Sequence, residues 1–338
     1  METQERSRML GTMEMGRLVP KVSIPIMISM MVQAMYNVVD GIFVAKYSAA
    51  ALTAVSLAYP IQMLMIAVST GLGVGFNSLI SRKLGEKRAE EAREAAKNGL
   101  FTELCGYLLF LVFGLFLAKP FFNLFTPEAE LQELGGEYLS IVCVFSFGLF
   151  FGICFERMMQ ATGNTVLSMV TQMTGAVSNI ILDPIMIFGL LGFPAMGVAG
   201  AAIATVIGQI GGMTLGLVLN QAKNVELRLH LKGFRPDKTI LKGILDVGFP
   251  SIIMQSISSV MNVLMNMILL GFGTAAVNVL GVYFKLQSFV FMPVFGLSNG
   301  LVAILGYNYG ARMRKRVYDA LKVALIWAAA IMLLGMLA

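Results

Sequence analysis

The sequence predicts an all-α integral membrane protein with about nine transmembrane helices. Hydrophobic residues make up 57% of the chain and charged residues only 13%, with a mean hydropathy of +0.78. An ordinary soluble domain carries about 25% charged residues. Apolar runs of about 20 residues recur along all 338 residues, and each is long enough to cross a bilayer as a helix. A long block near the start of the chain also recurs near its end.

The predicted spans are separated by turn-rich or charged stretches. Breaks are expected at 118–120, 126–128, 161–164, 192–194 and 271–273, where proline, glycine, asparagine or charged residues interrupt the apolar sequence. The nine spans are 18–44, 51–80, 98–118, 136–157, 165–189, 196–220, 240–270, 276–306 and 317–338.

Basic residues predict the orientation of these spans. With the N-terminus inside, 22 of the 25 lysines and arginines fall on the inner side, and only Lys46 and Lys119 fall outside. This asymmetry follows the positive-inside rule and predicts a cytoplasmic N-terminus. It also explains the net charge of +6 without a nucleic-acid partner. The polar first 16 residues have no short apolar core with a small-residue cleavage site, so no cleaved signal peptide is expected, and the first span is expected to direct membrane targeting.

The internal repeat aligns residues 22–97 with 247–322 at a constant offset of 225, without gaps and with 14 identical positions. The Gly-Leu-x-x-Gly motif at 71–75 recurs at 296–300. Six spans separate the two starting points, and an even number returns the chain to the same side of the membrane. The copies are therefore expected to be parallel, related by an axis along the membrane normal, as in secondary transporters built from two bundles.

The repeat divides the chain into a six-helix N-terminal lobe (1–220), a cytoplasmic linker (221–239) and an incomplete C-terminal lobe of about three helices (240–338). The second copy stops at Ala338, before its later helices have partners. We therefore expect the sequence to be a truncated form of a longer chain and a poor exporter by itself.

Ionisable residues inside apolar spans are costly and often functional. Asp40 lies near the outer end of the first span, and Gln33, Tyr36 and Asn37 precede it by seven, four and three residues. This spacing places the four side chains on one helix face. The face is therefore a candidate lining for a polar cavity.

The fifth span repeats this arrangement with Asp183, preceded by Asn179 and Gln172 on one face. Two carboxylates at the same depth cannot both ionise cheaply, so one takes up a proton or a cation balances them. Carboxylate, amide and carbonyl oxygens also suit sodium. The alternative is that the two acids serve only helix packing.

Other polar residues carry weaker signals. Glu103, Glu156 and Arg157 are expected at the inner membrane interface, and Lys285 could line the second lobe's cavity or pair with an acid. The single histidine, His230, excludes a multi-histidine metal site. The 25 methionines and 23 phenylalanines could form an adaptable surface for lipophilic molecules or simply fill lipid-facing positions. The three cysteines, Cys105, Cys143 and Cys154, do not have the sequence spacing of a metal site or of a redox-active pair.

Six segments carry recognisable motifs, namely 33–44, 52–56, 71–75, 179–184, 197–205 and 248–250. Together they resemble the multidrug and toxin extrusion (MATE) family over essentially the whole chain. The resemblance implies a twelve-helix fold of two six-helix lobes that exports amphipathic, cationic organic compounds in exchange for a proton or sodium ion. It is nearest to the DinF-like branch, whose coupling acids match Asp40 and Asp183, with Asn179 beside them; Tyr36 and Thr205 match cavity positions.

The resemblance implies a monomer in a bacterial or archaeal plasma membrane, with small-molecule substrates, no resident cofactor and no enzymatic activity. A branch with an acid on the seventh helix is not supported, because that span contains Gln255 and Asn262 but no interior acid. A flippase for lipid-linked precursors is an alternative, although only Lys285 suggests the basic cavity it would need. A membrane-embedded enzyme would need a cluster of a nucleophile, a metal or an acid–base set, and the sequence suggests none. A channel is disfavoured because the acid pair lies in one half only, whereas a pore would lie on the repeat axis.

Overall fold

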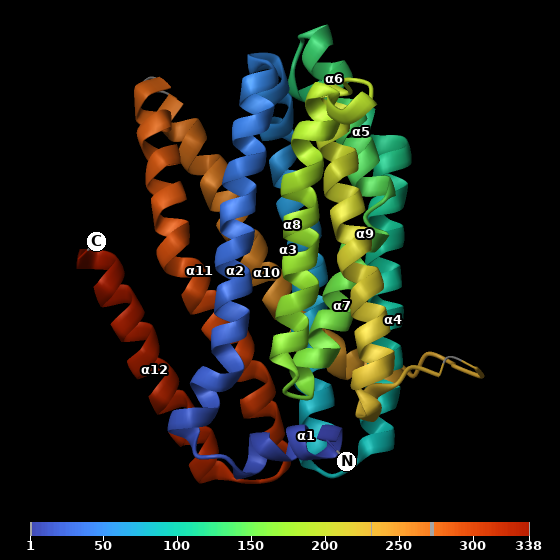
Figure 1. Cartoon of the computed structure of the whole chain (residues 1–338), viewed down its shortest axis with the longest axis vertical. Coiled ribbons are helices and arrows are strands. Elements are labelled where there is room, and N and C mark those ends of the chain that lie inside the picture. The colour runs from blue at the N-terminus through green and yellow to red at the C-terminus, as the bar shows by residue number, and fades with distance from the viewer. Residues whose placement is uncertain (1, 231, 271–273, 338) are drawn as a thin grey trace.

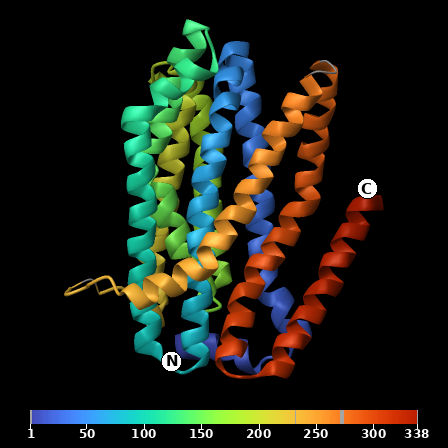
Figure 2. The ribbon, with the colours of Figure 1, turned by 180° about the vertical axis from the view of Figure 1, so that it is seen from behind.

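The computed structural model describes residues 2–230, 232–270 and 274–337. In these ranges the chain is helical, with two short 3-10 turns and one π-helical turn, and contains no strand. Figures 1 and 2 show long helices running roughly side by side, with α12 on the outside. The helices are α1 (Glu2–Thr12), α2 (Met15–Tyr47), α3 (Ala49–Gly85), α4 (Ala89–Val112), α5 (Ala118–Phe125), α6 (Ala129–Val144), α7 (Phe147–Ala161), α8 (Thr165–Phe188), α9 (Gly197–Lys223), α10 (Lys238–Leu270), α11 (Thr274–Gly310) and α12 (Arg314–Leu337).

Eight helices of the described chain are long and apolar enough to cross a membrane, and a bent pair brings the number to nine. The prediction of about nine spans is therefore confirmed. The bent pair is α6 and α7, which meet at an angle of 42° and form the predicted fourth span. At the bend, the carbonyl of Cys143 accepts hydrogen bonds from Ser146 Oγ (2.8 Å) and from the Ser146 backbone N–H (3.3 Å).

The break expected at 118–120 is wrong. The helix that starts at Ala89 continues to Leu124 and passes through a π-helical turn at Phe113–Leu117. Gly114 in this turn lies against α6, because a Cβ added there would be 2.7 Å from the Cβ of Cys143. Pro120 is the third residue of α5, which directly follows the π-helical turn. Packing against α6 and a π turn therefore keep one helix continuous.

The contacts between the repeat copies follow the sequence offset of 225. Gly71 of α3 lies against α10, where an added Cβ would be 2.8 Å from Ile252 N. Gly296 of α11 lies against α2, where an added Cβ would be 2.7 Å from Met27 Cα. Positions 71 and 296 differ by 225, and so do positions 27 and 252. Helix α3 thus packs on α10 in the same way as α11 packs on α2.

A second repeat-related contact joins α3 directly to α11. Gly85 faces the backbone of Tyr307, and Gly310 faces the backbone of Arg82. Here too the paired positions differ by 225. Only glycine allows helix backbones to come this close. These contacts lie at the end of the bundle where the turns 86–88, 162–164 and 311–313 are found, called the basic end below (Figure 1).

The N-terminal helix α1 also lies at the basic end. A buried cluster joins it to α2, α11 and α12, and includes Leu10, Leu18, Val22 and Ile304. Arg316 donates hydrogen bonds to the last carbonyls of α1 and of the turn that follows it. Away from this end, α10 and α11 diverge from the other helices (Figures 1 and 2). The two repeat copies are therefore in close contact at the basic end and separated at the opposite end.

Candidate functional site

The predicted acids of the first and fifth spans meet between α2 and α8, which pack along each other. The carboxyl groups of Asp40 and Asp183 lie within hydrogen-bonding reach of each other. Asp183 is completely buried, and Asp40 is partly buried. Tyr36 lies one helical turn before Asp40 and close enough to interact electrostatically with both carboxyl groups.

Asn179 connects this carboxyl pair to a third helix. Its Nδ2 donates to Asp183 Oδ1 (3.3 Å) and to Thr205 Oγ1 on α9 (3.1 Å). Closer to the basic end, Gln172 Nε2 donates to Gln33 Oε1 (3.0 Å) and links α8 to α2. The residues predicted for the two faces therefore lie in one polar seam, with members from α2, α8 and α9.

Three oxygen atoms of this seam are buried without a hydrogen-bond partner: Asp40 Oδ1, Asp183 Oδ2 and Asn179 Oδ1. Each unsatisfied buried oxygen costs about 1–3 kcal/mol. A proton on one carboxyl group would give the pair a donor and remove the repulsion between the charges. A small cation would instead take these oxygens as ligands, because sodium, like other hard cations, prefers carboxylate and amide oxygens. The residues present therefore fit either ion.

Sequence reasoning missed two neighbours of the pair. Tyr138 of α6 is 2% exposed and interacts electrostatically with both Asp40 and Asp183. Gln62 Nε2 of α3 donates to the Tyr138 hydroxyl oxygen (3.0 Å), so α3 and α6 close the seam. Gln62 is one of the polar positions kept in the repeat, which was an available signal, whereas nothing in the sequence around Tyr138 marks it.

One predicted cavity residue does not join this cluster, and another cannot be placed because its side chain lies outside the described residues. Asn37 is exposed on α2, although it shares the sequence spacing of the face. The side chain of Lys285 lies outside the described residues, so its predicted role stays a prediction.

The expected interfacial placement of Glu103 is wrong, whereas Arg157 lies four residues before the end of α7 and its interfacial placement stays a prediction. Glu103 is 0% exposed and accepts a hydrogen bond from Ser69 Oγ (2.8 Å). Arg157 is 4% exposed and donates to Gln160 Oε1 (3.0 Å). Helix α4 begins at Ala89, well before the predicted start of the span at 98, so Glu103 lies about four turns into the helix. It faces other helices of the bundle rather than the interface.

Comparison with known proteins agrees with this architecture. The MatE family model matches residues 25–185 and 250–338. The multidrug export protein MepA of Staphylococcus haemolyticus (strain JCSC1435) is 27% identical over 310 residues, which cover 91% of this chain and 68% of MepA. The chain thus spans about two thirds of the length of this relative.

Solved structures show the same fold. A MATE protein in complex with MaL6 has a TM-score of 0.91 and 29% identity, covering 96% of this chain and 72% of the other. An outward-facing multidrug resistance MATE family transporter of the MOP superfamily has a TM-score of 0.88 and 28% identity, with coverage of 97% and 72%. The family match, the relative and these structures together show that the chain belongs to the MatE family, whose members are membrane transporters and not enzymes.

Proposed function

We propose that this protein exports amphipathic, cationic organic compounds in exchange for a proton or a sodium ion, by alternating access between its two repeat copies. The observation that carries the proposal is the Asp40–Asp183 pair with its three unpartnered buried oxygens. In this proposal, Asp40, Asp183 and Asn179 bind the coupling ion.

The physical basis is the cost of charge at this position. Two carboxylates in a low-dielectric site cannot both be ionised cheaply, so the pair has affinity for a proton or a cation. A bound ion would draw α2 and α8 together. Because Asn179 of α8 is hydrogen-bonded to Thr205 of α9, a movement of α8 would also move α9. Ion binding can drive a transition only if one state of the protein binds the ion more tightly than the other.

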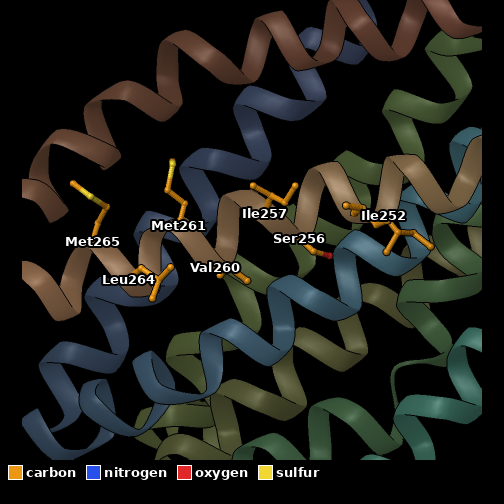
Figure 3. A pocket seen from close by; sticks show the side chains of 8 residues that line it. Ile252, Ser256, Ile257, Val260, Met261, Leu264 and Met265 are labelled. Carbon is orange, nitrogen blue, oxygen red and sulfur yellow. The ribbon is translucent and has the colours of Figure 1, made fainter.

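An apolar hollow along α10 supports a lipophilic substrate. It measures about 430 Å³, within the range of small-molecule sites, and Figure 3 shows side chains such as Met261 and Met265 along it. Ile257, Val260 and Leu264 are each more than half exposed there. Flexible methionines adapt to ligands of different shape. The relative named a multidrug export protein is consistent with this chemistry.

The contacts between the repeat copies support alternating access. Close packing at Gly85 and Gly310 shuts the basic end, while α10 and α11 diverge at the other end. The concentration of lysine and arginine at the basic end supports a cytoplasmic location for it and for the N-terminus. The state described is then closed toward the cytoplasm. The proposed setting is the plasma membrane of a bacterium or archaeon, with the protein as a monomer.

The test is dye transport into everted vesicles that carry a form of the protein with both six-helix lobes, under an imposed proton gradient or an imposed sodium gradient. Asp40→Asn and Asp183→Asn should each abolish gradient-driven uptake, because each keeps the side chain's size but removes a titratable charge. The double variant should be no worse than either single one, since residues that serve one event are not additive. Glu137→Gln, which changes an exposed acid on α6, is the matched control and should retain transport.

A binding measurement on the purified chain complements the transport assay. If sodium is the coupling ion, replacing potassium with sodium should raise the melting temperature of the parent protein but not of Asp183→Asn. If the proton is the coupling ion, sodium should leave the melting temperature unchanged, and lowering the pH should raise the melting temperature of the parent protein but not that of Asp183→Asn. Normal uphill transport by Asp40→Asn and Asp183→Asn would exclude the proposed coupling site.

A further inference from the structure

A second buried carboxyl group lies away from the Asp40–Asp183 pair. Glu103 of α4 is 0% exposed, deep inside a membrane-spanning helix. Ser69 Oγ of α3 donates to its Oε2 (2.8 Å), while its Oε1 is buried without a hydrogen-bond partner. Its interactions are with α3 and α7, whereas the Asp40–Asp183 pair lies between α2 and α8. The proposed coupling site therefore does not use it.

The groups around Glu103 give a carboxylate little support. Arg157 of α7 is the basic residue that influences it, but the described residues contain no ion pair within 4.0 Å between Glu103 and a lysine or arginine. Arg157 instead donates to Gln160 and is also attracted by its neighbour Glu156. The remaining titratable group facing Glu103 is the buried thiol of Cys154, also on α7.

We propose that Glu103 holds a proton and is a second proton-binding site of this protein, separate from the Asp40–Asp183 pair. A buried carboxylate with one hydrogen bond and no direct counter-ion is less stable than the neutral acid. The neutral form needs no counter-ion and can still accept the hydrogen bond from Ser69. The proton is bound as O–H on the carboxyl group, with no other bond made or broken.

The position of this site links it to the contact between the repeat copies. Ser69 is followed along α3 by Thr70, whose Oγ1 donates to Gln255 Oε1 of α10 (2.9 Å), and by Gly71, which packs on Ile252. One turn of α3 therefore contacts Glu103 through Ser69 and contacts α10 through Thr70 and Gly71. By linkage, a change in the packing of α10 should change the proton affinity of Glu103.

Infrared spectroscopy of the purified chain tests the proposal, because a protonated carboxyl group has a C=O band that a carboxylate lacks. At pH 7, Glu103→Gln should lose one carboxylic-acid band relative to the parent protein. Glu94→Gln is the matched control on the same helix: Glu94 is exposed and pairs with Lys97 (2.8 Å), so only carboxylate absorption should fall. The spectrum of Asp40→Asn, measured in the same way, identifies any carboxylic-acid band that comes from the Asp40–Asp183 pair.

Loss of carboxylate absorption in Glu103→Gln, with every acid band retained, would overturn the proposal and make Glu103 an ionised partner of Arg157. Ser69→Ala provides a second measurement if Glu103→Gln does not insert. It removes the hydrogen bond to Oε2, so the acid band should persist and move to higher wavenumber; an unchanged band would refute the assignment. Gln255→Leu should shift the pH midpoint of the band, and an unmoved midpoint would exclude the link to α10.

Discussion

Replacing Gly85 with alanine should open the basic end of the molecule. The added Cβ would lie 2.8 Å from the carbonyl carbon of Tyr307 and 3.1 Å from Ala311 N, and closer still to the carbonyl oxygen of Tyr307. Ordinary van der Waals contact begins at 3.4 Å, so α3 and α11 must separate by about 0.6 Å to relieve the first of these contacts. All three obstructing atoms belong to the backbone, so a side-chain rotation cannot remove the clash.

The size of the effect follows from the cost of overpacking. Inserting a methyl group into a tightly packed contact costs about 1–3 kcal/mol. The clash exists only where α3 and α11 touch, so the ratio of closed to open molecules should fall about 5–150-fold. Alanine is also about 0.5–1 kcal/mol better than glycine inside a helix, but this gain is the same in both states and leaves the ratio unchanged.

The assay is a distance distribution between spin labels at Glu90→Cys and Lys315→Cys, with the exposed Cys105 replaced by serine. Gly85→Ala should increase the population at long distance. The matched control is Gly211→Ala, because a Cβ on Gly211 meets nothing within 4 Å and should not change the distribution. If the two variants give the same distances, the close contact at Gly85 does not hold the basic end shut.

Three further predictions concern single contacts. Thr205→Val removes the hydrogen bond that orients Asn179, and should weaken binding of the coupling ion about 10–100-fold in calorimetry; unchanged affinity would exclude that orienting role. Arg316→Gln removes the hydrogen bonds to Met13 O and to Leu10 O, of which Leu10 O keeps Asn308 Nδ2 as a donor. Trypsin should then cleave α1 faster than in the parent protein; equal rates would show that the arginine does not secure the helix. Backbone N–H groups, first that of Ile240, hold the pKa of Asp237 below its ordinary value of 3.8. The Asp237 cap of α10 is therefore stabilising above about pH 4, and it is lost as the pH falls through the lowered pKa. Amide exchange at Ile240 should then rise in acid by more than the intrinsic exchange rate accounts for, and it should be fast at every pH in Asp237→Ala. Exchange in Asp237→Ala equal to that of the parent protein would argue against the cap.

The spans could be predicted from the sequence because the requirement for them is local. A backbone that crosses a bilayer must satisfy its own hydrogen bonds, and a run of about 20 apolar residues that does so is a helix. Helix ends and internal breaks are not local in this sense. The chain continues as a helix through 118–120 because α6 receives Gly114 and because a π turn absorbs the mismatch. Likewise, the depth of Glu103 depended on where α4 begins.

The site was predictable to the extent that it depends on helix periodicity. Spacings of three, four and seven residues placed Gln33, Tyr36 and Asp40 together on α2, and a spacing of four placed Asn179 beside Asp183 on α8. That Asn37 is exposed despite the same periodicity shows the limit of this reasoning.

The sequence by itself therefore determined the membrane spans, most of the polar residues of the α2 and α8 faces, and the expectation that the two copies run in the same direction. Only the tertiary structure decided that Asp40 meets Asp183, that Tyr138 completes their surroundings and that Glu103 lies buried beside Ser69. The reason is that periodicity specifies a direction around one helix axis. Which neighbour lies in that direction depends on how close the helices approach, and here glycine contacts between the repeat copies allow that approach where the copies meet.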